Sequence, residues 1–155
     1  MFWRSIVFGL ALALALAPAA AYGRVQTEAE TPVHFQDRVD AARQSMMRDP
    51  QAALDLANAA EPRIAVDVSP DARNEARATV NWLRAEALTR LGRPADAGPA
   101  AQQALADLGP RPAATKLYAD ILVATARIEK LLGRYGEALE RFQSAYSVFR
   151  DVGEP

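Results

Sequence analysis

The sequence of 155 residues contains no cysteine and only one histidine, His34. Without cysteine there can be no disulfide framework, zinc ribbon, thiolate-held cluster or cysteine nucleophile. A single histidine cannot build a two-histidine metal site, and His34 lies near the start of the first predicted helix of the mature chain, where we expect an ordinary surface residue. The sequence therefore predicts neither a metal site nor a cofactor.

A strong charge of one sign is also missing. The 18 basic and 19 acidic residues give a formal net charge of -1, and like charges never form a block of five. We therefore expect no binding of nucleic acid. No Gly-x-Ser-x-Gly sequence or phosphate-binding glycine loop occurs, and the neighbouring carboxylates lie in a linker or on helix surfaces. We therefore expect no catalytic residue. A small exported enzyme is kept only as a distant alternative.

The first residues have the pattern of a secretory signal peptide. Arg4 precedes an uncharged apolar run over residues 6–17, and Pro18 is followed by alanines that offer a cleavage site after Ala21. The alternative is a retained membrane anchor, although the run is shorter than the roughly 20 residues of a span. Residues 22–33 are polar and aperiodic, which predicts a flexible linker. We expect the mature chain in a bacterial periplasm, touching the membrane only through an uncleaved signal segment.

From His34 onward, apolar residues recur every three or four positions, which is the helical period. With 34 alanines in the chain, the composition also favours helix. The pattern predicts six helices, whose apolar stripes run over Phe35–Met46, Ala53–Ala60, Ala72–Leu91, Ala97–Leu108, Leu117–Leu131 and Ala138–Phe149. Apolar and other residues alternate over 63–70, where we expect an extended loop, with Ser69 capping the next helix.

Tight turns within helix pairs and longer loops between pairs predict αα-hairpin repeats, and thus an all-α solenoid of about three pairs over residues 34–155. An all-α bundle is the alternative. The last pair resembles the tetratricopeptide repeat family, because its turn and second helix read Leu132-Gly133-Arg134-Tyr135-Gly136-Glu137-Ala138-Leu139, followed by Phe142 and Ala145. Weaker copies surround Ala97 and Ala53. These alanine anchors are 44 and 41 residues apart, so the loops are longer than in the family's repeat of about 34.

The resemblance implies a groove lined by the first helix of each pair, and a protein or peptide as the partner. The implied groove residues are Phe35, Arg38, Ala42, Ser45, Thr79, Trp82, Glu86, Thr89, Asp120, Val123, Arg127 and Lys130. Trp82 is either a binding anchor or packed beneath the loop of residues 62–70. Arg127 and Lys130 are either a carboxylate clamp or a solvated helix face.

Small residues in the repeats let the helices reverse and approach each other. These positions are Gly92, Ala97, Gly133, Ala138 and Ala145. We expect the rings of Tyr135 and Phe142 to fill the gap between helices.

The last helix carries apolar residues that no later element of the chain covers. Phe142, Phe149 and Val152 are expected to be partly exposed, so the repeat domain is either incomplete at its C-terminus or open to a partner. This helix also looks like repeats in exported N-terminal regions of bacterial signalling proteins, including membrane diguanylate cyclases with a GGDEF domain and sensor kinases. The prediction is a non-catalytic binding scaffold. The alternative is a sensory region whose catalytic domain is not in this chain.

Overall fold

The computed structural model describes residues 34–110 and 112–153, and every regular element in these ranges is helical. The prediction of an all-α fold is therefore confirmed. The predicted signal peptide and linker lie outside the described residues. The α-helices are α1 (Phe35–Ser45), α2 (Pro50–Ala60), α3 (Ile64–Asp67), α4 (Arg73–Arg90), α5 (Pro94–Leu108), α6 (Lys116–Leu131) and α7 (Tyr135–Asp151), with 3-10 turns at Glu61–Arg63 and Pro70–Ala72.

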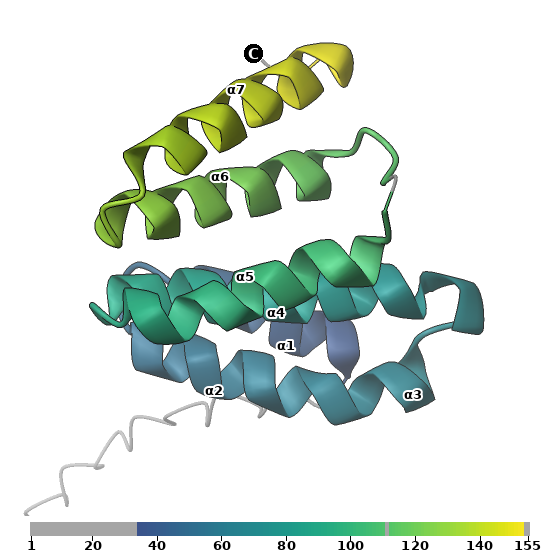
Figure 1. Cartoon of the computed structure of the whole chain (residues 1–155). Helices are drawn as coiled ribbons and strands as arrows, with labels where there is room; N and C mark the ends of the chain where they lie inside the picture. Colours follow the sequence, from purple (N-terminus) through teal and green to yellow (C-terminus); the bar gives the residue numbers. More distant parts are fainter. Residues whose placement is uncertain (1–33, 111, 154–155) are drawn as a thin grey trace, which may run out of the picture. The chain divides into compact units, whose positions relative to one another are not determined.

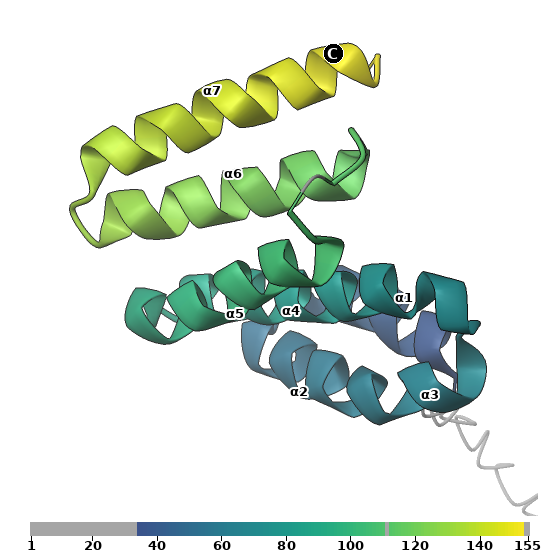
Figure 2. The same cartoon turned by 45° about the vertical axis from the view of Figure 1, so that its right-hand side comes forward.

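The six long helices form three consecutive antiparallel pairs, α1 with α2, α4 with α5 and α6 with α7 (Figure 1). Neighbouring pairs meet through the second helix of one and the first helix of the next, because α2 packs on α4 and α5 packs on α6 (Figure 2). The first helices also touch, since α4 contacts both α1 and α6. This arrangement places α1, α4 and α6 along one side of the stack.

Alanine allows these helices to pack closely. Ala97 and Ala101 of α5 share a buried cluster with Ala85 of α4 and Ile128 of α6, so one helix is enclosed by its neighbours on both sides. Ala138 and Ala145 are the buried residues of α7. A side chain of one methyl group lets two helix axes approach to the short end of the usual 8–10 Å range. Ala97, Ala138 and Ala145 are thus all buried between helices.

A glycine ends the first helix of the second pair and the first helix of the third pair in the same way. Gly92 follows α4 and Gly133 follows α6, with φ of 72° and 79°. The next N–H groups turn back onto the helices, because Arg93 N–H donates to Leu88 O and Arg134 N–H donates to Glu129 O at 2.9 and 2.8 Å. This is a Schellman cap, which requires a left-handed residue at the reversal. The chain therefore reverses at both glycines.

The extended loop predicted over residues 63–70 is wrong, because this segment contains α3 and parts of two 3-10 turns. Ile64 is buried and Val68 packs against the same core, whereas Val66 is 71% exposed. Ile64 and Val68, which face the core, are thus four residues apart, as expected for a helix. The segment is too short for the sequence to distinguish this spacing from alternation. The predicted cap is also wrong: the Ser69 side chain makes no cap hydrogen bond, and α4 begins at Arg73.

The prediction that Tyr135 fills the space between helices is wrong. Its side chain is 69% exposed, and Leu131, predicted on the buried side of α6, is also exposed. Phe142 is 37% exposed, so it fills that space only in part. The reason is that α7 makes its substantial contacts with α6 alone, and it does so through Ala138 and Ala145. The larger rings lie on a different face of the helix.

Candidate binding groove

Two adjoining cavities lie on the side formed by the first helices. The first, of about 670 Å³, is enclosed by α1, the residues after α3 and the start of α4. The second, of about 330 Å³, lies between α1, α4 and α6. Arg43 lines both, so we treat them as one groove with a first and a second cavity. The second cavity is lined by Arg43, Met46, Met47, Trp82, Leu83, Glu86, Arg90, Asp120, Val123 and Arg127.

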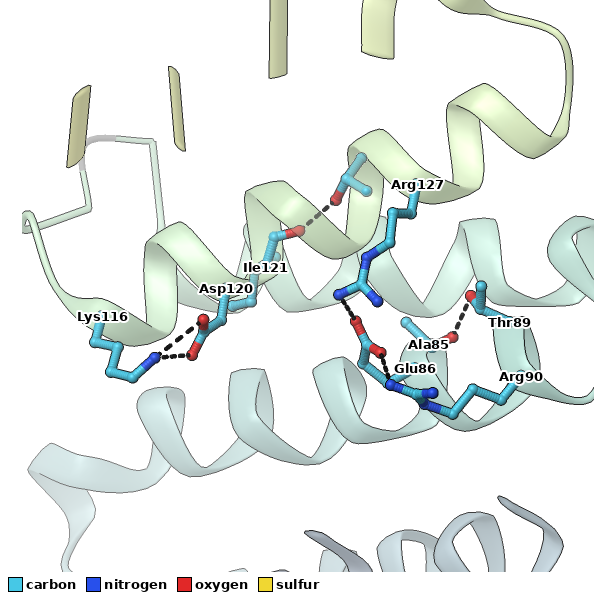
Figure 3. A network of polar contacts seen from close by, with 9 residues as sticks. Ala85, Glu86, Thr89, Arg90, Lys116, Asp120, Ile121 and Arg127 are labelled. Atoms are coloured by element: carbon cyan, nitrogen blue, oxygen red, sulfur yellow. Dashed lines mark hydrogen bonds and ion pairs between the residues drawn. The ribbon is translucent and has the colours of Figure 1, made fainter. Parts of the chain in front are cut away.

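The residues predicted from the second and third pairs fall largely in this groove. Thr79 lines the first cavity. Trp82, Glu86, Asp120, Val123 and Arg127 line the second. Thr89 lines neither cavity, and its hydroxyl donates to Ala85 O within α4 (Figure 3). Lys130 is exposed and lines neither cavity.

The residues predicted from the first pair are displaced by one position. Ala42 is a buried core residue and Arg38 donates from Nη1 to Ala59 O, which directs both toward α2. Phe35 reaches the first cavity but is also a core residue, and Ser45 lines none of the cavities. The groove is lined instead by the next residue in each case, Gln36, Val39, Arg43 and Met46.

The turn after α1 differs from the turns after α4 and α6. The turn between α1 and α2 covers 46–49, whereas the corresponding turns after α4 and α6 cover 91–93 and 132–134. The first turn is one residue longer and uses no left-handed glycine, since Asp49 N–H donates to Ser45 O in a helical geometry. The groove positions of α4 and α6 are counted back from a left-handed turn glycine, and this reference point is missing after α1.

Trp82 connects the groove to the core. Its side chain is half-buried and packs against both the cluster around α1 and α2 and the cluster shared by α4, α5 and α6. The guanidinium carbon of Arg43 lies 5.8 Å from the centre of the ring, within the range of a cation–π contact. The ring thus forms part of the cavity wall and also supports the packing of the first two pairs.

A buried carboxylate on α4 forms an ion pair with α6 in the groove. Glu86 accepts from Nη2 of Arg127 at 2.6 Å, and Nη2 of Arg90 lies 3.7 Å from its other oxygen (Figure 3). Glu86 is almost fully buried, whereas the Arg127 side chain is 43% exposed. The solvated-face alternative for Arg127 is therefore only partly right, because its guanidinium is fixed by an ion pair between helix pairs.

The two cavities differ in charge. Three arginines and two carboxylates line the second cavity, and one arginine and two carboxylates line the first, with His34 beside them. In the first cavity, the hydrogen bond from Arg63 is the main cause that lowers the pKa of Asp67, and the hydrogen bond from Phe35 N–H adds to it. Asp67 therefore remains ionised at neutral pH, and its carboxylate fixes the start of α1 against α3.

Sequence reasoning missed several groove residues. Arg43, Met46 and Met47 were missed because the first turn has no left-handed glycine from which to count, and Arg90 because it lies outside the counted positions. The spacing of Arg90 four residues after Glu86 is a signal that was available, since such residues are neighbours on a helix.

Comparison of the chain with protein-family models, curated proteins and solved structures finds no match. Over residues 34–110 and 112–153, no three histidine, aspartate or glutamate side chains gather as a metal site would need. None of the described helices combines the length and hydropathy needed to cross a bilayer. The geometry of the groove therefore carries the functional argument.

Proposed function

We propose that the chain is an exported, non-catalytic binding module of the tetratricopeptide-repeat-like kind, which takes a peptide segment of a protein partner in the groove of α1, α4 and α6. The second cavity is the observation that carries this proposal. It combines the Trp82 ring and two methionines with three guanidinium groups in a concavity of about 330 Å³. Aromatic and arginine side chains in a concave site are typical of residues that dominate binding energy. The export is proposed from the signal-peptide pattern.

The lining favours a particular peptide chemistry. Met46, Met47 and Val123 offer an apolar surface beside Trp82, which suits one apolar side chain of the ligand. Arg43 and Arg90 add positive charge at the rim, which suits an acidic group next to that side chain. The first cavity has an excess of carboxylates, so a basic group fits there. An extended segment that spans both cavities would place its basic group in the first cavity and its acidic group in the second.

The test is fluorescence polarisation with labelled synthetic peptides that carry one apolar residue between a basic and an acidic end. Met47 lines the second cavity and is 74% exposed, so Met47→Glu changes the groove without opening the core. The matched control is Val66→Glu, since Val66 is an equally exposed apolar residue that lines neither cavity. We expect Met47→Glu to weaken binding by about tenfold, which corresponds to about 1.4 kcal/mol, and Val66→Glu to leave it unchanged.

Two results would contradict the proposal. One is that no peptide of this design binds the unaltered chain. The other is that both substitutions leave binding equal, which would locate the binding surface outside the groove. Peptides with the two charged ends exchanged serve as the control for orientation, and we expect them to bind more weakly because each end then meets like charge.

A further inference from the structure

Two carboxylates line the first cavity, and they differ in how they are held. Asp67 accepts hydrogen bonds from the Arg63 guanidinium at 2.7 and 3.0 Å, and from Phe35 N–H at 2.8 Å. Glu75 lines the same cavity from the first turn of α4 and is exposed. The Thr79 hydroxyl donates to the main-chain oxygen of Glu75 and not to its carboxylate. Over residues 34–110 and 112–153, no side chain forms a hydrogen bond or ion pair with that carboxylate, so its charge is available to a ligand.

The basic side chains that line the first cavity are directed to other partners. Nδ1 of His34 lies 3.9 Å from the Asp67 carboxylate. The guanidinium of Arg43 lies 5.8 Å from the centre of the Trp82 ring, and its Nη1 lies 3.5 Å from Asp40. Arg43 is therefore held beside Trp82, which follows Glu75 by seven residues on α4. The groove thus has a free negative charge at one end and positive charge farther along it.

We propose that Glu75 selects the ligand of the groove by pairing with a lysine or arginine side chain of an extended peptide, three positions along the peptide from the apolar residue that contacts Trp82. This inference rests on the proposed function, because it names the part of the peptide that the first cavity binds. A hydrogen bond between a carboxylate and an ammonium or guanidinium group is stronger than one between neutral groups. An acidic peptide residue at the same position would meet like charge, which opposes binding.

The positions of Glu75 and Trp82 on α4 set the spacing in the peptide. Seven residues advance a helix by about 10.5 Å and return to nearly the same side of it, so the two side chains lie in line along the groove. In a polyproline II segment, residues three positions apart lie on one side and are about 9.3 Å apart. In a β-strand, the nearest residues on one side are two or four positions apart, at about 6.6 or 13.2 Å. A spacing of three is the closest match.

The groove between these two residues is uncharged on α4. Ala76 and Thr79 lie between Glu75 and Trp82 in the helix, and both line the first cavity. The two peptide positions between the basic and the apolar residue therefore need no charge. Only the first and the last of these four positions are expected to be selective.

Exchange of charge at residue 75 tests the pairing. Labelled peptides with blocked ends carry lysine, two neutral residues, leucine and a following glutamate, and each is made in both sequence directions. The comparison peptide has glutamate in place of the lysine. In fluorescence polarisation, Glu75→Lys should weaken binding of the lysine peptide by about threefold to tenfold and strengthen binding of the comparison peptide by a similar factor. A folding defect would weaken both, so only opposite changes support the pairing.

Asp55→Lys is the matched control. Asp55 is exposed on α2 and lines neither cavity, and its substitution changes the net charge by the same amount. At about 150 mM salt the Debye length is about 8 Å, so this distant change should leave both affinities within about twofold. If Asp55→Lys alters the preference as much as Glu75→Lys does, the net charge of the chain sets the preference and the proposed pairing is wrong.

A second series of peptides tests the spacing, with the lysine two, three, four or seven positions from the leucine. We expect the tightest binding at three. Tightest binding at another spacing overturns the proposed arrangement, and a spacing of seven would indicate a helical ligand that follows α4. Equal binding at every spacing would show that the lysine has no fixed partner, which also overturns it.

Failure of this inference differs from failure of the proposed function. If no peptide binds the unaltered chain, the peptide groove is wrong and the role of Glu75 is wrong with it. If the peptides bind and Met47→Glu weakens them, but Glu75→Lys changes the affinity of the lysine and comparison peptides alike, the groove is supported and the role of Glu75 is wrong.

Discussion

Replacing Gly133 by alanine tests the turn that joins α6 to α7. Gly133 has φ of 79°, and a Cβ at this position would meet no atom within 4 Å. The cost of the substitution is therefore one of backbone conformation and not of collision. An L-residue in the left-handed region costs about 1–2 kcal/mol. The loss of unfolded-state freedom on changing glycine to alanine offsets about 0.4–1 kcal/mol of this. We expect a net destabilisation of about 1 kcal/mol, and more for Gly133→Val.

Gly136→Ala is the matched control, three residues later. Gly136 lies in the first turn of α7 without a left-handed φ, and a Cβ there also meets nothing within 4 Å. Alanine is favoured over glycine within a helix, so this variant should gain about 0.5 kcal/mol. The two substitutions are chemically identical, and the expected difference between them is about 1.5 kcal/mol.

Urea unfolding followed by circular dichroism at 222 nm measures this difference, and melting provides a second reading. For a domain of this size, 1 kcal/mol corresponds to a shift in Tm of roughly 4 °C. The unfolding slope m should be the same in all three chains, because the surface exposed on unfolding does not change. If Gly133→Ala is as stable as the unaltered chain, or if both variants shift in the same direction, the left-handed cap at residue 133 is wrong.

Two further predictions concern charged contacts. Asp67→Asn should lower the Tm at neutral pH. Because the pKa of Asp67 is lowered in the folded state, its stabilising effect is present above the ordinary carboxyl pKa of about 4 and is lost as the pH falls further. The difference in Tm between the two chains should therefore shrink below pH 4, and a difference that is constant from pH 7 to pH 3 would refute this reasoning. A double-mutant cycle of Glu86→Gln and Arg127→Met should give a coupling of about 1 kcal/mol in unfolding free energy, reduced by the exposure of Arg127. Coupling near zero would mean that the ion pair does not join α4 to α6 in solution.

The helical spacing of apolar residues, and the glycines and prolines at helix ends, determined much of the fold. Because a left-handed reversal favours glycine, Gly92 and Gly133 could be identified as turns without knowledge of any neighbour. The buried faces of α1 and α2 could also be predicted from local sequence, because apolar residues such as Val39 and Ala57 recur at helical spacing. Residues 63–70 could not, because a single helical turn is too short to show its period.

The groove was predictable only where a turn glycine sets the count. Trp82 and Arg127 were found because the turns after α4 and α6 contain a glycine that sets the count. Arg43 was missed because the turn after α1 has no left-handed glycine from which to count. The chain thus fixes which residues are helical and which face of each helix is apolar, through interactions between near neighbours. Contacts between distant segments decide the rest. They pair Glu86 with Arg127 across 41 residues, and they leave Tyr135 exposed because no described helix lies over it.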